Sequence, residues 1–459
     1  MAETPAMNDT QELSQLSPLE WIMPRSHISQ ILCFPSASPR ISKVLRDGLA
    51  GTVRDVPYLT SRVVSRGHPK GSVALSPPCD SLSDLFRVND LLTTVDYNAL
   101  KSGGFKPSLF DGLDLFSPDL VPANRSPSPV FRAVLSPVKG GCLLCVSLHH
   151  STADITAFGS LLKIWASHCR TGSSAAVQFS QSWLDRTAIA RQSHDAPADT
   201  PLLLHKEENN DSASRPSNPP EMETQFFRYS AGYLKGLKVE VNKHLPAGTS
   251  WVSTSDILTA ILWGSIVSSE TTGDDVDAVD EECFMRIAVN CRSRLKPPLP
   301  RDYLGAAFGV SLVNAKKGDL AAIGTTTEQT TSVSAIANVA ASVRRSVNLI
   351  NGDAMGAIIK HLATREDVTG LKLCQQPASV SVVSWADQGV YELDWGTELG
   401  HCEAVRLPTW KTKRYPVVFP RLSNGDLEVL VSFDTEMMKR WKQVYDMSPW
   451  RVEKAQDLV

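Results

Sequence analysis

Two adjacent histidines, His149 and His150, and the nearby Asp154 are the side chains of this chain best suited to acid–base chemistry. Histidine has a pKa close to neutral pH, so its ring can take a proton from a hydroxyl or an amine. Asp154 can stabilise the start of a helix or hold a fixed ion pair. The three residues together predict a general base on a short turn.

The sequence around these residues indicates two rigid elements that hold the turn. Residues 142–148 (CLLCVSL) form a nearly unbroken apolar run, which is typical of a buried strand. Apolar residues then recur at the spacing of an amphipathic helix, at Ile155, Phe158, Leu161, Leu162 and Trp165. We therefore expect the histidines at a strand-to-helix turn.

Three other roles compete with catalysis. The histidines could be ordinary polar residues at a strand end. His150 and Asp154 could share a helical face around a metal, but zinc needs about three or four protein ligands, and no other His, Cys or Glu cluster supplies them. We expect no metal. Cys142 and Cys145 should point to opposite faces of a strand, so they predict core positions and not a redox pair.

Length and composition indicate a globular protein of two or three domains, because the chain has 459 residues, 42% of them hydrophobic and 21% charged. The net charge of −3 provides no field that would attract nucleic acid or an anionic membrane. Residues 1–15 do not resemble a signal peptide, and the cysteines favour a reducing compartment. We expect a cytoplasmic monomer.

A composition change near the middle divides the chain into two halves. Residues 194–223 are rich in proline, asparagine and charge, which is typical of a linker. We therefore predict domains at 1–195 and 223–459, joined by a crossover at 196–222. Each half mixes strands and helices, an α/β pattern in which ligands tend to bind between the halves. A second polar insert, Ser268–Glu282, predicts a surface loop.

Several elements of the second half also follow from local patterns. Ser253–Asp256 reads as a helix cap before the apolar run Ile257–Trp263. Strands are expected at 284–289, 379–383 and 427–433, and a closing helix at 437–444.

Spaced motifs from residue 16 to residue 445 share their order with one family. They are Leu16–Glu20, His149-His150-x-x-x-Asp154, Ser253–Ala260, Val289–Leu295 with Tyr303–Gly305, Ser384-Trp385, and Asp394-Trp395-Gly396. In this order they resemble the BAHD acyl-CoA-dependent acyltransferases, and within them the fungal branch that includes the trichothecene acetyltransferases. The chain departs from the pattern at Trp395, where the family has Phe, at Thr397-Glu398, where it has Trp-Gly, and at Val383, where many members have Thr.

The resemblance implies two chloramphenicol-acetyltransferase-like α/β domains with a channel between them. Acyl-CoA, with acetyl-CoA as the expected donor, would enter from one face and a small-molecule acceptor from the other, with no tightly bound cofactor. His150 would take the proton from the acceptor hydroxyl or amine. Asp154 would point away from the substrate and pair with an arginine, Arg292 as first choice and Arg294 as second.

The resemblance also implies roles for residues of the second half. Ser384 and Trp385 would donate hydrogen bonds to the oxyanion of the intermediate, although Trp385 could equally be a core residue. Asp394, Trp395 and Gly396 would be structural. Ser253 and Thr254 would line the CoA channel, and as helix caps they are equally well explained.

Alternative functions stay open at this stage. A freestanding condensation-type or cyclising enzyme could use the same histidine, and a non-catalytic binding protein could retain the same fold. A serine hydrolase is excluded by the lack of a Gly-x-Ser-x-Gly motif, and phosphate-binding glycine motifs are absent as well. Nothing in the sequence identifies the acceptor.

Overall fold

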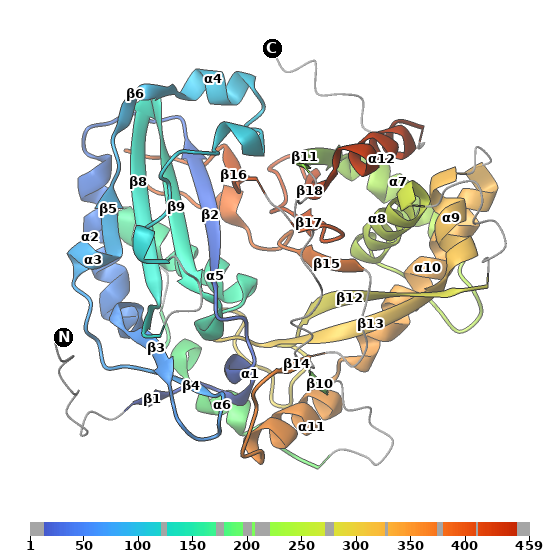
Figure 1. Cartoon of the computed structure of the whole chain (residues 1–459), viewed down its shortest axis with the longest axis horizontal. Helices are drawn as coiled ribbons and strands as arrows, with labels where there is room; N and C mark the ends of the chain where they lie inside the picture. Colours follow the sequence, from blue (N-terminus) through green and yellow to red (C-terminus); the bar gives the residue numbers. More distant parts are fainter. Residues whose placement is uncertain are drawn as a thin grey trace.

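The structure is a computed structural model. It describes residues 13–120, 126–170, 179–195, 204–206, 221–270, 280–325, 329–373, 380–409 and 412–447. Two mixed α/β halves lie side by side, the first coloured blue to teal and the second mostly green to red (Figure 1). This is the fold class expected from the sequence.

A six-stranded sheet forms the centre of the first half, in the order β16-β2-β9-β8-β5, with β6 also paired to β8. Strands β2, β9 and β8 are antiparallel neighbours, and β9 is buried along its whole length. Gly140 joins β8 to β9 with φ +80°, a left-handed conformation that glycine adopts without strain. The strands are β2 (His27–Phe34), β5 (Phe86–Val88), β6 (Leu91–Asp96), β8 (Phe131–Lys139), β9 (Gly141–His149) and β16 (Ala404–Arg406).

Both faces of this sheet are covered, which explains the continuous apolar run in β9. Helices α2 (Ile41–Asp55) and α5 (Ile155–Cys169) pack on one face, and α4 (Tyr97–Ser102) packs with the other. Cys142 belongs to the first apolar cluster and Cys145 to the second, so the two thiols lie on opposite faces, as the strand alternation predicted.

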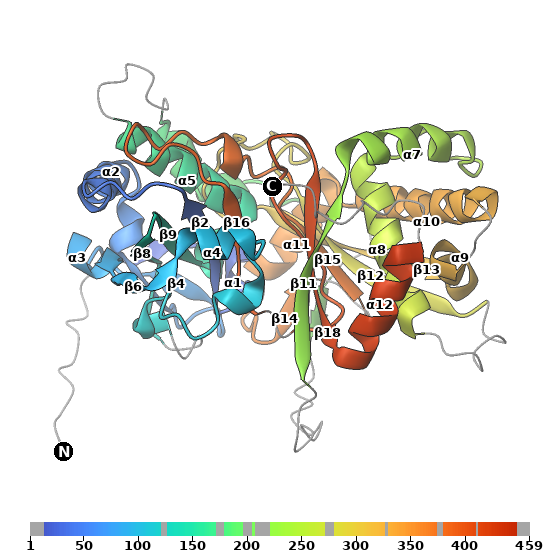
Figure 2. The same ribbon diagram turned by 90° about the horizontal axis from the view of Figure 1, so that it is seen from above.

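The second half is built on another six-stranded sheet, in the order β11-β18-β17-β15-β12-β13. Its apolar core lies between the sheet and a layer of helices, which Figure 2 shows on the far side from the first half. The strands are β11 (Met222–Tyr229), β12 (Glu282–Asn290), β13 (Phe308–Lys316), β15 (Val380–Ser384), β17 (Val417–Val418) and β18 (Leu427–Asp434). The helices are α7 (Ala231–Lys243), α8 (Thr254–Glu270), α9 (Lys317–Thr325), α10 (Gln329–Leu349) and α12 (Thr435–Met447).

Smaller elements complete the two halves. A four-stranded sheet has the order β1-β4-β3-β7, and a two-stranded sheet pairs β10 with β14. The strands are β1 (Ser14–Gln15), β3 (Arg62–Ser65), β4 (Val73–Leu75), β7 (Ser128–Pro129), β10 (Leu204–Lys206) and β14 (Leu371–Leu373); the helices are α1 (Pro18–Trp21), α3 (Leu82–Leu85), α6 (Thr187–Ala190) and α11 (Gly352–Ala363).

The second half contributes a strand to the first sheet, and the two halves share one core. Strand β16 comes from the second half of the sequence but pairs antiparallel with β2 in the first sheet, as its orange-red ribbon beside the blue β2 shows (Figure 1). The largest apolar cluster contains residues from both halves, among them Trp165, Tyr303 and Phe419. Two glutamines, Gln30 and Gln388, are hydrogen-bonded across the interface at 2.8 Å.

Two predicted loops differ in part from the structure. Helix α8 continues to Glu270 and β12 begins at Glu282, so the ends of the insert Ser268–Glu282 are regular structure, and residues 271–279 lie outside the described residues. In the predicted crossover 196–222, Leu204–Lys206 form β10, whereas 196–203 and 207–220 lie outside the described residues. No helix in the described ranges is long and apolar enough to cross a membrane.

Candidate active site

The turn that carries the two histidines is held at both ends. Strand β9 ends at His149, a single 3₁₀ turn spans His150–Thr152, and Asp154 caps helix α5. The backbone N–H of His149 donates to the carbonyl of Val130 and that of His150 to the carbonyl of Ser26, both at 2.8 Å. The histidines therefore sit at the strand-to-helix turn that the sequence predicts.

One hydrogen bond fixes the proton of the His150 ring. Nδ1 lies 3.0 Å from the carbonyl oxygen of Ala153, which can only accept, so Nδ1 carries the hydrogen and Nε2 of the neutral ring keeps its lone pair. Among the described residues, none forms a hydrogen bond with Nε2. Burial lowers the pKa of His150 below its usual value, although the Ala153 carbonyl and Asp154 act in the other direction. The ring is thus a neutral base with an available nitrogen.

His149 is held in the opposite tautomer. It is buried, its Nδ1 accepts from the backbone N–H of Ser151 at 3.1 Å, and its ring meets the edge of His27 at 5.0 Å between centroids. Nδ1 therefore has no hydrogen of its own. Burial lowers the pKa of His149 to about 3, which keeps the ring neutral. His149 shapes the turn, and His150 is the residue with a free basic nitrogen.

Asp154 faces away from the histidines and into a buried ion pair. Arg292 donates from Nη1 to Oδ2 at 2.8 Å and from Nη2 to Oδ1 at 2.9 Å, a bidentate geometry. The backbone N–H groups of Ala157 and Ala307 donate to the same carboxylate, each at 2.9 Å. Burial acts to raise the pKa of Asp154, but the charge and hydrogen bonds of Arg292 outweigh it, and the pKa is lowered.

Within the second half, Arg292 also donates from Nη2 to the carbonyls of Tyr303 and Gly305, both at 2.9 Å. Arg294 instead donates to the carbonyls of Val347 and Ile350. Arg292 is therefore the partner of Asp154, and Arg294 is not. Because the pair joins residues of both halves, it connects the turn that carries the histidines to the domain interface.

Two of the residues expected at the oxyanion and the CoA channel, Ser384 and Thr254, line one small cavity. Ser384 is exposed at the end of β15 and shares a cavity of about 70 Å³ with Thr254. Ser253 forms a capping box with Asp256, as its sequence pattern predicted. Trp385 is buried against Phe419, with the ring centroids 5.1 Å apart. Neither Ser384 nor Trp385 is hydrogen-bonded to His150 in the described part of the chain.

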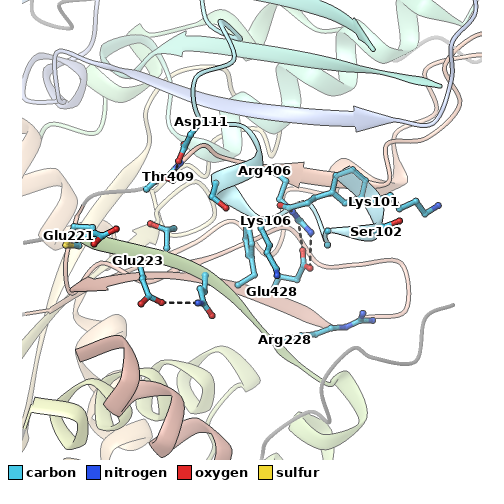
Figure 3. Close-up of a pocket in the computed structure, with 18 of the residues that line it drawn as sticks. Lys101, Ser102, Lys106, Asp111, Glu221, Glu223, Arg228, Arg406, Thr409 and Glu428 are labelled. Atoms are coloured by element: carbon cyan, nitrogen blue, oxygen red, sulfur yellow. Dashed lines mark hydrogen bonds and ion pairs between the residues drawn. The ribbon is translucent and has the colours of Figure 1, made fainter. Parts of the chain in front are cut away.

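A larger cavity of about 1520 Å³ lies between the halves (Figure 3). Arg406 and Glu428 are among the residues that line it, and they form an ion pair with contacts of 2.7 and 3.1 Å. Arg406 pairs with Ile31 on β2, four residues from the His27 that pairs with His149, which is about 13 Å along the strand. Neither cavity described here is lined by His150, so the channel expected to reach that residue stays a prediction.

Family models match most of the chain. A model described as the Transferase family matches residues 110–447, and a model of the trichothecene 3-O-acetyltransferase-like N-terminal domain matches residues 29–169. The chain belongs to the Transferase family. The expected resemblance to the fungal acetyltransferase branch of the BAHD enzymes is thereby confirmed, and the protein is an acyltransferase.

Individual relatives agree with this family. The chain is 24% identical to the O-acetyltransferase ptmV of Penicillium ochrochloron, over 94% of each protein. It is 25% identical to the trichothecene 3-O-acetyltransferase TRI101 of Fusarium sporotrichioides, over 89% of this chain and 88% of that protein. The crystal structure of that enzyme with coenzyme A and T-2 has a TM-score of 0.77 at 22% identity, covering 94% and 97% of the two chains. Vinorine synthase has a TM-score of 0.60 at 17% identity, covering 97% and 96%.

In this transferase the Asp394-Trp395-Gly396 segment packs against the C-terminal end of α5, whereas the histidines precede its N-terminal end. Trp395 is fully buried and meets Trp165 edge-on, with centroids 5.5 Å apart. Gly396 has φ +88°, and a Cβ atom there would lie 3.0 Å from the carbonyl oxygen of Cys169. These contacts support the structural role that the resemblance implies.

Sequence reasoning missed three residues that hold the turn of this transferase. Arg25 donates to the hydroxyl of Ser151 at 2.7 Å, and Arg186 donates to the carbonyl of Thr152 at 3.2 Å and to Glu20 at 3.1 Å. Glu20 stands in the opening motif Leu16–Glu20, so part of the signal was present. Arg25 and Arg186 have no sequence signature, since their partners are reached only through the fold.

Proposed function

We propose that this transferase moves an acetyl group from acetyl-CoA to a hydroxyl of a small secondary metabolite, with His150 as the general base. The observation that carries the proposal is the His150 ring, which has its proton fixed on Nδ1 and whose basic Nε2 has no hydrogen-bond partner among the described residues. The names of the relatives, several of which are O-acetyltransferases, support a hydroxyl acceptor and an acetyl donor.

In the proposed reaction, Nε2 of His150 takes the hydroxyl proton while the acceptor oxygen attacks the thioester carbonyl. The C–O bond forms, and the carbonyl oxygen becomes an oxyanion. When the intermediate collapses, the C–S bond breaks, and the proton returns from His150 to the CoA thiolate. A base of this kind accelerates a reaction by about 10²–10⁴-fold. No acyl-enzyme is required, because proximity of the two bound substrates supplies much of the remaining acceleration.

Two further assignments belong to this proposal. We assign the oxyanion contact to Ser384 or Trp385, which requires a donor about 2.7–3.1 Å from the reacting oxygen in the substrate complex. Asp154 acts through its bond with Arg292, because in the described part of the chain its carboxylate is bonded to Arg292, Ala157 and Ala307 and not to His150. Its role is to hold the turn in place and not to relay a proton.

Acceptor-dependent release of CoA tests the proposed reaction. The purified protein is mixed with acetyl-CoA and a panel of terpenoid, alkaloid and polyketide alcohols, and free thiol is followed with a colorimetric reagent. We expect thiol release only with an accepted alcohol, in equal amount to the acetyl ester found by mass spectrometry. A burst of thiol without acceptor would indicate an acyl-enzyme and contradict direct transfer. Transfer only from carrier-bound acyl groups would favour the condensation-type alternative.

A further inference from the structure

A second buried acid–arginine pair contacts the turn that carries His150. Glu20, in α1, is 0% exposed, and the side chain of Arg186 is 10% exposed. Arg186 donates from Nε to Oε1 of Glu20 at 3.1 Å and from Nη2 to the carbonyl of Thr152 at 3.2 Å. The Glu20 carboxylate also accepts from the backbone N–H groups of Ser17, at 2.6 Å, and Ala306, at 3.4 Å. All are donors, which stabilise an ionised carboxylate, although burial outweighs them and raises the pKa of Glu20 above its usual value.

The two acid–arginine pairs bind neighbouring groups of the second half. Asp154 accepts from the backbone N–H of Ala307, and Glu20 accepts from that of Ala306. Arg292 donates to the carbonyls of residues 303 and 305 in the same segment. The segment 303–307 is therefore connected to the histidine turn in two places. One connection is Asp154, which follows the turn, and the other runs from Glu20 through Arg186 to Thr152, inside the turn.

The contact of Arg186 with the Thr152 carbonyl lies next to the peptide group that orients the His150 ring. Thr152 directly precedes Ala153, whose carbonyl holds the Nδ1 hydrogen of His150. The guanidinium of Arg186 is itself fixed, since its carbon lies 4.4 Å from the centre of the Tyr58 ring, and the Tyr58 hydroxyl donates to Leu304. A shift of Arg186 would release the peptide next to the one that sets the direction of Nε2.

We propose that Glu20 and Arg186 form a second positioning pair for His150, which holds the base in its working orientation when the segment 303–307 is docked. The inference rests on the proposed role of His150 as general base. Neither residue contacts the substrates in this assignment; both act through the carbonyl of Thr152. A simple ion pair would require only the contact between Arg186 and Glu20. Arg186 also donates to the carbonyl of Thr152, which lies in the turn that carries His150.

The test separates positioning from folding stability by removing both charges together. The variants are Glu20→Gln, Arg186→Met and the double change, and each is assayed for kcat, for KM of acetyl-CoA and for thermal unfolding. Each single change leaves a buried polar group without its partner, so both Tm and kcat should fall. The double change should recover much of the Tm, but kcat should stay about 10–100-fold below wild type because the turn is displaced. KM of acetyl-CoA should change by less than about threefold.

Two further variants complete the test. Arg186→Lys keeps the charge but has a single ammonium that cannot serve Glu20 and Thr152 in the planar geometry of the guanidinium, so kcat should fall with a smaller loss of Tm. Arg191→Gln is the control. It changes an arginine that is 63% accessible and follows α6, the short helix that Arg186 precedes, and it should leave both kcat and Tm unchanged.

Each outcome decides one of the two proposals. A double variant or Arg186→Lys with wild-type kcat would overturn the positioning role. Full activity of His150→Ala in the same assay would instead overturn the proposed function itself. Loss of activity in His150→Ala with normal kcat in the Glu20 and Arg186 variants would leave His150 as base and remove only the second pair.

Discussion

His149 and His150 are neighbours in sequence, but the fold gives them opposite tautomers. Nδ1 of His149 accepts a hydrogen bond from a backbone N–H, and Nδ1 of His150 donates one to a backbone carbonyl. The sequence identified the pair as chemically important, but it did not show which ring keeps a free basic nitrogen. Which ring keeps the free nitrogen depends on the orientation of the peptide groups in the turn His150–Thr152, and the spacing of apolar residues does not predict that orientation.

The lowered pKa of His150 predicts the pH dependence of the enzyme. As the proposed general base, His150 works in its neutral form, and burial shifts its protonation to a pH below the ordinary value of 6.5. As pH falls, kcat/KM should therefore decline with a midpoint below pH 6.5. Initial rates from pH 4.5 to 8, with CD spectra at each pH to verify folding, test this. An acid limb centred above pH 6.5 would contradict the buried, uncharged state of the ring.

The pair of Asp154 and Arg292 predicts a large loss of stability when one charge is removed. Asp154→Asn leaves the Arg292 guanidinium buried without its counter-ion, which costs about 3–5 kcal/mol. Urea unfolding measures this loss. Asp47→Asn is the matched control, because the Lys43–Asp47 pair is exposed and should contribute at most about 1 kcal/mol. Equal effects of the two changes would show that Asp154 is not a buried anchor.

At the scale of elements, local sequence patterns predicted the helices and strands whose apolar residues recur at the period of the element. The apolar run before His149 is β9, the capped repeat after it is α5, and the capping box at Ser253 starts α8. The ends of the insert Ser268–Glu282 were wrong, because α8 continues through serines that are buried at positions 268 and 269. Polar composition indicated a loop there, but tertiary packing decides the helix end.

The Asp394–Gly396 segment gives a prediction at this scale. Gly396→Ala places a Cβ atom in a left-handed conformation and against the end of α5, so it should destabilise the protein by about 1–3 kcal/mol. Gly236→Ala, inside α7 with open space around the new Cβ, should instead be neutral or stabilise by up to about 1 kcal/mol. Thermal unfolding of both variants compares them. An unchanged Tm for Gly396→Ala would remove the backbone argument for this glycine.

For the whole molecule, the two α/β halves could be predicted, but the pairing of a strand from the second half with the sheet of the first could not. The predicted crossover at 196–222 stays a prediction. Strand β16 pairs with β2 although more than 370 residues separate them in the sequence. Likewise, Asp154 had two candidate arginines, and only the docking of the segment 303–307 selects Arg292 over Arg294. Pairings over such separations depend on topology, and a single sequence gives no signal for them.

The shared core predicts that the halves work only together. A fragment of residues 1–195 lacks β16, so the edge of β2 and the interface side chains would be exposed and prone to aggregation. It should show no acyl transfer, whereas protein cleaved within 196–222 should stay associated and active. Limited proteolysis, size-exclusion chromatography and the thiol assay check both forms. Transfer by the fragment alone would contradict a site between the halves.

The most direct test of the account is the turnover of His150→Ala with an accepted alcohol. His149→Asn is the matched control, because its side-chain oxygen can still accept from the N–H of Ser151 and preserve the turn. We predict that His150→Ala lowers kcat by about 10²–10⁴-fold with an unchanged CD spectrum, while His149→Asn loses less than about tenfold. Near-wild-type turnover of a folded His150→Ala variant would contradict the assignment of His150 as the general base.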